Sequence, residues 1–176
     1  MIIQLHKGTG LIGNLIKWQT RGVYSHASII IDEDLIFEAR EFKGVGFNWR
    51  YEFKNIDYYY ISLSLSQQFK AVEFIDKVNG SEYDYKMVAR FMTRMSESNK
   101  TKDKYFCSEL VFDLLHYCGI DLFKNTQGWE VSPHLLSRSP ILEKINEKDV
   151  KNYRNRWNNI AYGKLLDLSE RIAKIT

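Results

Sequence analysis

The chain has 176 residues, of which 44% are hydrophobic and 27% are charged, and its formal net charge is +3. This length suits one domain with a substantial core, and the composition excludes disordered and fibrous proteins. The small net charge gives no sign of a nucleic-acid partner, and no stretch is long and apolar enough to predict a membrane span. The start, MIIQLHKGTG, lacks the basic and apolar regions of a secretory signal.

The first half of the chain predicts strands and one short helix. MIIQL suggests a strand, and the apolar stripe within residues 10–20 predicts a helix. SHASIII and LIFEAR predict two antiparallel strands around an Asp-Glu-Asp turn at 32–34. We interpret GVGFNW, at 44–49, as a turn after a strand, and the alternating run at 58–66 as a further strand.

The middle of the chain is predicted to be helical. One helix is expected to have Ser66 as its N-cap and to end at Gly80, and a second is expected over 82–95. A polar, charged segment at 96–104 is expected to be a mobile loop. The next predicted helix starts near Cys107.

The end of the chain predicts further helices. Ser132 and Pro133 are typical of an N-cap and a first helical position, and the apolar spacing at 158–175 predicts an amphipathic helix. That helix would pack on its own domain, form a homodimer contact or lie on a membrane surface. We therefore predict a catalytic domain over 1–150 and a helical extension over 151–176. The element order indicates an α+β fold with an antiparallel sheet or small barrel packed with helices.

The two cysteines, Cys107 and Cys118, are too few for a disulfide framework. Both fall in one predicted helix, where a separation of about 16 Å exceeds the reach of a disulfide. Two free thiols are typical of a reducing compartment, so we expect a cytoplasmic protein.

Cys107, in the stretch KYFCSEL, begins a predicted helix whose apolar residues recur on the face that carries the cysteine. Its thiol would point inward from the first turn, where unpaired backbone N–H groups and the helix dipole stabilise a thiolate or an oxyanion. This placement suits the nucleophile of an acyl transfer. The alternative is a buried core thiol, because free cysteine is among the most buried residue types, and Cys118 fits that description.

Among the four histidines, His26 stands out because it begins an apolar strand. If the turn at 32–34 is a three-residue loop, His26, Ser28 and Glu38 lie on one face of the sheet, with Glu38 diagonal to His26. A carboxylate there would orient a histidine that acts as a base. A two-residue loop would move Glu38 off that face and leave it a solvated carboxylate. Considered alone, His26 is better explained as a core histidine than as a functional one.

Other kinds of site find little support in the sequence. No CxxC, HxxxH or HxH pair predicts a metal site, and no P-loop or GxGxxG predicts a nucleotide site, so we expect neither a metal nor another cofactor. His6 is an alternative base only if the N-terminal strand lines the site. His116 and His134 are interpreted as residues on helix surfaces.

The order of these motifs resembles the permuted NlpC/P60 proteins of the papain-like superfamily, especially the YiiX/YebB-like group. The matching pieces are YSHAS, FEAR one hairpin later, YD before a helix, YFCSEL and a later SP. The resemblance covers roughly residues 8–140. It implies a circularly permuted papain-like fold in which Cys107 is the nucleophile, His26 the base and Glu38 the orienting carboxylate.

Together, the residues and the resemblance predict a cysteine-dependent hydrolase, an amidase or peptidase, that forms a thioester acyl-enzyme. Tyr24, Tyr105 and Ser108 neighbour the motifs and are candidates to bind the substrate, which we expect to be a small peptide- or lipid-like molecule. Two alternatives remain. One is a lipid acyltransferase or thioesterase at a membrane surface, held there by the amphipathic tail without stable insertion. The other is a catalytically inert binding module on the same fold.

Overall fold

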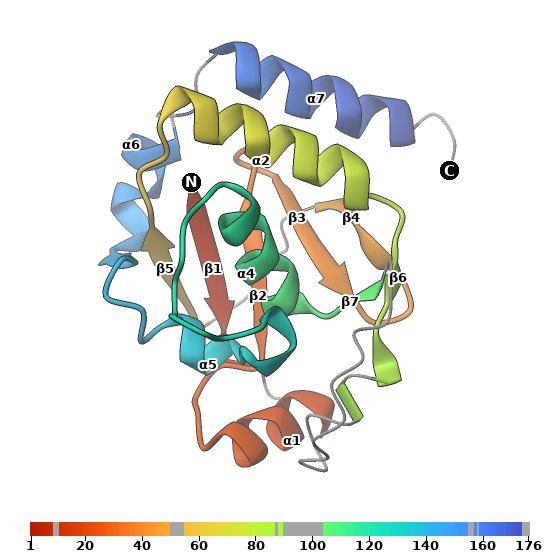
Figure 1. The fold of residues 1–176 in the computed structure, drawn as a ribbon, viewed down its shortest axis with the longest axis vertical. Coiled ribbons are helices and arrows are strands. Elements are labelled where there is room, and N and C mark those ends of the chain that lie inside the picture. Colours follow the sequence, from red (N-terminus) through yellow and green to blue (C-terminus); the bar gives the residue numbers. More distant parts are fainter. Residues whose placement is uncertain are drawn as a thin grey trace.

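A six-stranded antiparallel sheet forms the centre of the fold (Figure 1). The computed structural model describes residues 1–8, 11–49, 55–86, 88, 89, 104–154, 157 and 159–173. The sheet has the strand order β4-β3-β2-β1-β5-β8. Its strands are β1 (Ile2–His6), β2 (His26–Ile30), β3 (Leu35–Arg40), β4 (Gly44–Trp49), β5 (Ile56–Tyr60) and β8 (Glu143–Ile145). A separate parallel pair joins β6 (Glu82–Tyr83) to β7 (Lys104–Tyr105).

Helices pack against one face of the sheet, and the last helix of the chain lies beside them along the top of the view in Figure 1. α4 (Cys107–Tyr117) lies against β2 and β3, α2 (Leu65–Val78) packs beside α4, and α7 (Asn159–Ala173) packs on α2. The other helices are α1 (Leu11–Thr20), α5 (Pro133–Leu136) and α6 (Val150–Arg154), with 3-10 turns at Gly128–Glu130 and Glu147–Asp149. Among the described residues, no helix combines the length and the apolar character needed to cross a bilayer.

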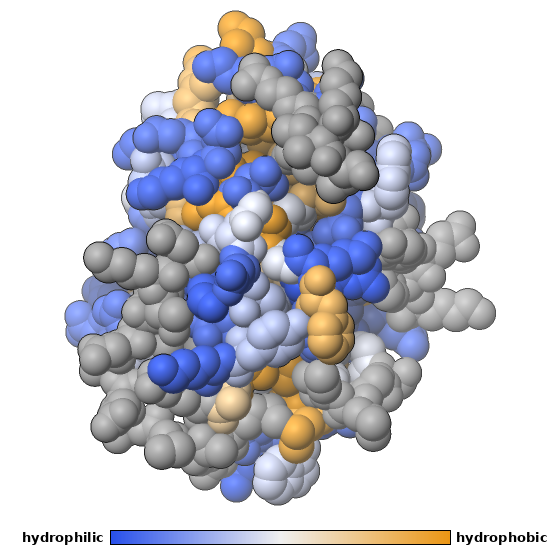
Figure 2. Space-filling model, turned by 90° about the vertical axis from the view of Figure 1, so that its right-hand side faces the viewer, coloured by the Kyte–Doolittle hydropathy of each residue, from blue (hydrophilic) through white to orange (hydrophobic). Residues whose placement is uncertain are grey.

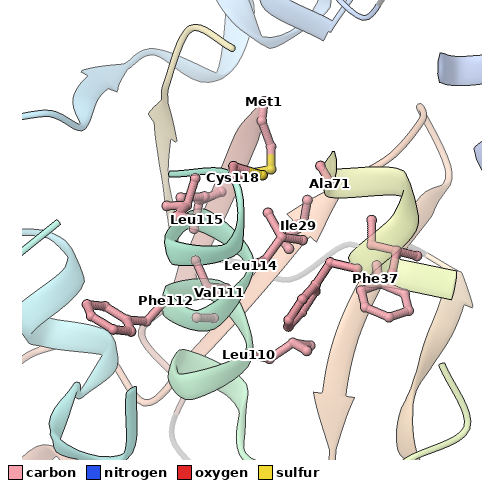
Figure 3. Close-up of a cluster of buried hydrophobic side chains, with 14 of the residues drawn as sticks. Met1, Ile29, Phe37, Ala71, Leu110, Val111, Phe112, Leu114, Leu115 and Cys118 are labelled. Atoms are coloured by element: carbon pink, nitrogen blue, oxygen red, sulfur yellow. The ribbon is translucent and has the colours of Figure 1, made fainter. Parts of the chain in front are cut away.

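The main core lies between the sheet and α4. Leu110 and Leu114 of α4 and Ile29 and Phe37 of the sheet are fully buried, and Figure 3 shows them facing one another. Because alternate residues of a strand point to opposite faces, a second cluster forms on the other side of the sheet around Ile30. The main core fixes α4 on the sheet and thereby fixes the position of the residue with which α4 begins.

Two segments differ from the sequence predictions. GVGFNW is the strand β4 and not a turn, and it pairs with β3 along its whole length. Its strand signal is the alternation of Val45 and Phe47, both of which pack on the core, and the two glycines obscured it. Gly44 is required where β4 begins, because its φ is 77° and an added Cβ would lie 2.5 Å from the carbonyl oxygen of Ser81.

The alternating run at 58–66 is also only partly a strand, since β5 ends at Tyr60. The N-cap of α2 is Ser64 and not Ser66, because the Ser64 hydroxyl accepts from the Gln67 backbone N–H while the Gln67 side chain accepts from the Ser64 backbone N–H. This capping box outweighs the strand-like alternation of the segment. The helix expected over 82–95 does not start at Glu82, because Glu82 and Tyr83 form the strand β6, and most of its remainder lies outside the described residues. Of the loop expected at 96–104 only Lys104 is described, and it belongs to the strand β7.

The amphipathic helix predicted at 158–175 is confirmed as α7. Ala161 and Leu165 are fully buried, and they belong to the main core together with residues of α2. The Tyr162 hydroxyl donates to Asp32, in the turn between β2 and β3. The buried stripe of α7 thus packs on its own chain. The division into a domain and an extension, and the homodimer, stay predictions.

Candidate active site

The turn between β2 and β3 determines which side chains meet at the start of β2. Ile29 pairs with Phe37 and Ile30 with Ile36, and the Ile31 N–H donates to the Leu35 carbonyl at 2.9 Å. This register confirms the three-residue loop at 32–34.

The register brings Glu38 next to His26. His26 Nε2 donates to Glu38 Oε2 at 2.6 Å, the length of a strong, charge-assisted hydrogen bond. The Glu38 side chain is only 3% exposed, and its other oxygen lies 3.9 Å from Arg40 Nη1. A carboxylate this deeply buried needs such partners to remain ionised. With Nε2 engaged by Glu38, Nδ1 is the ring nitrogen of His26 that remains for other chemistry.

Cys107 occupies the first position of α4, at the end of the sheet where β2 also begins (Figure 1). The first helical hydrogen bond runs from the Leu110 N–H to the Phe106 carbonyl at 3.0 Å. The N–H groups of Cys107 and Ser108 precede that bond, so they have no acceptor within the helix and share the positive end of its dipole. The Cys107 sulfur lies close enough to His26 to act on the charge of its ring and raise the pKa of the imidazole. Glu38 is thus hydrogen-bonded to His26, and Cys107 begins α4 near the same imidazole.

The protonation of His26 follows from these contacts. Burial lowers the pKa of His26, but the Cys107 sulfur and the Glu38 carboxylate raise it by more, and the net pKa is about 10. His26 is thus an imidazolium at neutral pH, placed between a sulfur and a carboxylate. An imidazolium can stabilise a thiolate nucleophile and can later give its proton to a leaving group.

Cys118 provides an internal contrast. It is 2% exposed, and its Sγ lies 3.4 Å from the Gln67 carbonyl oxygen. Burial raises the pKa of the Cys118 thiol to about 11, and Lys70 offsets only part of that rise. This thiol belongs to the main core, where the sequence placed it.

The three residues predicted to bind substrate lie in different surroundings. Tyr24 is buried, and its hydroxyl donates to Asp57. Ser108 is fully buried and donates to the Val131 carbonyl at 2.7 Å. Tyr105 is half-buried on β7, the strand that leads to Cys107. The hydroxyls of Tyr24 and Ser108 are occupied by hydrogen bonds within the protein, and a role of all three in substrate binding stays a prediction.

Three buried polar side chains, His6, Ser28 and Gln4, lie beside His26, and the sequence predicted only part of this group. His6 pairs with His26 in the register of β1 and β2, and the two ring centroids lie 5.1 Å apart, edge to face. His6 Nε2 lies 3.1 Å from Ser28 Oγ, and Ser28 donates to Gln4 Oε1 at 3.0 Å. Because Ser28 uses its proton toward Gln4, His6 Nε2 is the donor toward Ser28. His6 is thus tied into the sheet as a neighbour of His26.

Tyr83 is a further residue near the cysteine. Tyr83 is 7% exposed, and it pairs with Tyr105 where β6 runs beside β7. Tyr105 is two residues before Cys107. Burial raises the pKa of Tyr83, and the Cys107 sulfur raises it further. The YD pair marked this position in the sequence, without indicating what Tyr83 would contact.

The residues that the structure describes do not gather a set of metal ligands. Within them, no group of three His, Cys, Asp or Glu side chains is arranged to hold a metal ion. A stable protein site for a transition metal generally requires at least three such donors.

Comparison with known proteins shows which solved structure has the same fold. No protein-family model and no curated protein matches the sequence. The structure superposes on the crystal structure of YiiX from Escherichia coli O157:H7, described as a metalloprotein of DUF1105, with a TM-score of 0.58 and 14% sequence identity. The match covers 82% of this chain and 94% of YiiX. This chain has the fold of YiiX. The likeness confirms the predicted α+β, permuted papain-like fold, and at this identity it shows the fold alone.

Proposed function

We propose that the protein is a cysteine-dependent hydrolase that cleaves an amide or ester bond through a thioester on Cys107. The observation that carries the proposal is the hydrogen bond from His26 to Glu38 beside the first residue of α4, Cys107, whose sulfur helps to raise the pKa of His26. Nucleophile, base and orienting carboxylate are the three parts that acyl transfer by a thiol requires.

In the first half of the reaction, the Cys107 thiolate attacks the carbonyl carbon and forms a C–S bond, while the carbonyl electron pair moves to oxygen. The backbone N–H groups at the start of α4 hold the resulting oxyanion. The oxyanion then collapses, the C–N or C–O bond breaks, and the leaving group takes the proton from His26 Nδ1. Cys107 is left as a thioester and His26 as a neutral imidazole.

In the second half, neutral His26 takes a proton from water, and the hydroxide equivalent attacks the thioester carbonyl. The C–S bond breaks and the acid product leaves. This restores the Cys107 thiolate and the His26 imidazolium, so the proton count balances over the cycle. Glu38 stays ionised throughout, holding the Nε2–H and so keeping Nδ1 directed at the sulfur.

The proposal does not require a metal. YiiX is described as a metalloprotein, whereas the described part of this chain offers no set of three ligands. We therefore assign every step to side chains and backbone groups near Cys107. Dialysis against EDTA is expected to leave the rate of Cys107 acylation unchanged.

The proposal is tested by trapping the thioester. The protein in a Cys118→Ala background is mixed with p-nitrophenyl acetate and rapidly acidified, and its intact mass is measured. We expect one acetyl group on Cys107 that neutral hydroxylamine removes, and none in Cys107→Ser. Wild-type protein should give the same single adduct, because Cys118 is buried with a raised pKa. If no hydroxylamine-sensitive adduct forms on Cys107, the proposal is wrong.

A further inference from the structure

A cavity of about 500 Å³ is lined in part by Lys104, the first residue of β7, the strand that leads to Cys107. It lies on the side of the molecule that carries β4, β6 and β7, where Figure 2 shows hydrophobic side chains among hydrophilic ones. Its lining comes from the turn before β4, from the loop between α2 and β6, from β6 and the residues after it, and from Lys104. Three segments far apart in the sequence thus build one hollow.

Three aromatic rings line this cavity from the inside to the rim. Tyr83 is buried, Tyr85 is half exposed and Phe42 is 90% exposed. The ring centroids of Tyr83 and Tyr85 lie 4.9 Å apart, and those of Tyr85 and Phe42 lie 6.0 Å apart. At its inner end the row lies beside the strand that leads to Cys107, because Tyr83 of β6 pairs with Tyr105 of β7, and Tyr105 is two residues before Cys107. An apolar group bound along the rings would be directed toward the sulfur.

The presence of a phenylalanine at position 42 does not help to stabilise the fold. Its φ is 63°, a left-handed conformation that costs a residue other than glycine about 1 kcal/mol. Its backbone N–H donates to the Tyr85 hydroxyl at 2.6 Å, which holds the turn against the rest of the row. A turn of this shape would be more stable with glycine or asparagine. A phenylalanine that is strained and almost fully exposed points to a use outside the core.

The rim of the cavity carries positive charge. Lys104 is neutralised by an ion pair with Glu82. Lys43 donates to the uncharged Asn48 side chain at 3.3 Å, and neither Lys43 nor Lys86 forms an ion pair with any residue in the described ranges. The remaining carboxylate of the lining, Asp84, is buried, and both Asp84 and Glu41 act on the inner ring, Tyr83, and raise its pKa. Lys43 and Lys86 are therefore the two lysines of the lining that have no ion-pair partner among the described residues, and both stand near the three aromatic rings.

We propose that this cavity binds the acyl donor, and that the donor joins an apolar group to an acidic group. The rings contact the apolar part, and Lys43 and Lys86 bind the carboxylate or phosphate. The inference rests on the proposed function, since it takes Cys107 as the reacting atom. It adds a substrate class, namely an amide or ester that is both apolar and anionic.

Three alkylating reagents with the same iodoacetyl group test this assignment in the Cys118→Ala background. Iodoacetamide is small and neutral, iodoacetanilide adds an aromatic ring, and 4-(iodoacetamido)benzoate adds a ring and a carboxylate. We expect saturable alkylation of Cys107 by the two aromatic reagents, with half-saturation at a concentration at least about fivefold lower for the acid than for the anilide. Each rate is divided by the iodoacetamide rate of the same variant, which removes differences in thiol reactivity.

Variants separate the two parts of the cavity. Lys43→Gln with Lys86→Gln should abolish the advantage of the acid over the anilide, whereas the matched control, Lys124→Gln with Lys148→Gln, should keep it. Phe42→Gly should weaken the binding of both aromatic reagents while leaving the urea midpoint equal or higher, since glycine tolerates the positive φ. Loss of binding in a protein that is at least as stable cannot be attributed to misfolding.

The outcomes distinguish this inference from the proposed function. A Cys107 that reacts with all three reagents no faster than glutathione overturns the proposed function and, with it, the inference. A reactive Cys107 that shows no saturation, or the same preference in the Lys43/Lys86 double variant, overturns the inference alone. If the acid is preferred, two competitors identify its source by slowing the alkylation of Cys107. Protection by N-acetylphenylalanylglutamate indicates the carboxylate of a peptide, and protection by dodecyl phosphate indicates the phosphate of a lipid.

Discussion

Replacing Glu38 with glutamine is the most specific perturbation of the candidate site. The substitution keeps the shape of the side chain and an oxygen that can accept from His26 Nε2, but it removes the negative charge at 2.6 Å. A hydrogen bond to a charged group contributes about 1.5–3 kcal/mol, and 1.36 kcal/mol corresponds to one pH unit. We therefore expect Glu38→Gln to lower the pKa of His26, about 10 in the wild type, by roughly 1 to 2.

The assay is a titration of the His26 ring by ¹⁵N NMR of the imidazole nitrogens, with His6→Gln as the assignment control. The same change should lower the rate of Cys107 acylation by about 10- to 100-fold at pH 7. An unchanged His26 pKa in Glu38→Gln would show that the carboxylate does not control the imidazolium, and the account of the site would be wrong.

The raised pKa of His26 also predicts how stability depends on pH. A group whose pKa is higher in the folded protein stabilises it fully below the unfolded value of about 6.5. That contribution is lost progressively as the pH rises to the folded value of about 10. Urea unfolding of the wild type should show this decline between pH 7 and 10, and His26→Ala should show less of it. Parallel curves would contradict the interpretation.

Three further predictions concern the scaffold. Partial burial raises the pKa of the Asp57 carboxyl, but Tyr24, Lys7 and Lys144 lower it by more, to about 2. The contribution of Asp57 to stability is therefore present above pH 4 and is lost as the pH falls toward 2. Asp57→Asn should cost about 1–2 kcal/mol of unfolding free energy at pH 7, measured in urea, and nothing at pH 2. Leu110→Ala should cost about 3 kcal/mol in the same assay, because Leu110 is fully buried between α4 and the sheet. Flotation with anionic liposomes should show no binding that depends on residues 159–173, because the stripe of α7 is buried on its own chain.

The sequence could predict those parts of the candidate site that depend on the spacing of residues within one hairpin or one helix. A three-residue loop at 32–34 fixes the register of its own hairpin, and that register alone places Glu38 diagonal to His26. The position of Cys107 follows from the apolar period of one helix. Both relations act within about 15 residues, where the geometry of a single element or hairpin is decisive.

The remainder depends on contacts between distant segments. His6 meets His26 only through the register of β1 and β2, which no short turn determines. The cavity requires the turn at Phe42 and the strand at Tyr83 to meet, and neither segment predicts the other. The strand β4 was missed because its two glycines weaken the strand signal, and one of them, Gly44, is required by the tight approach to Ser81.

The measurement that tests the central claim most directly is the rate of Cys107 alkylation by iodoacetamide at pH 6, in Cys118→Ala protein with and without His26→Ala. An unassisted thiol is under about 1% ionised at that pH, so its reaction is slow. The account predicts that the protein with His26 reacts at least about tenfold faster than His26→Ala. Equal rates in the two proteins, both at the level of glutathione, would show that Cys107 is a core thiol and that His26 does not activate it.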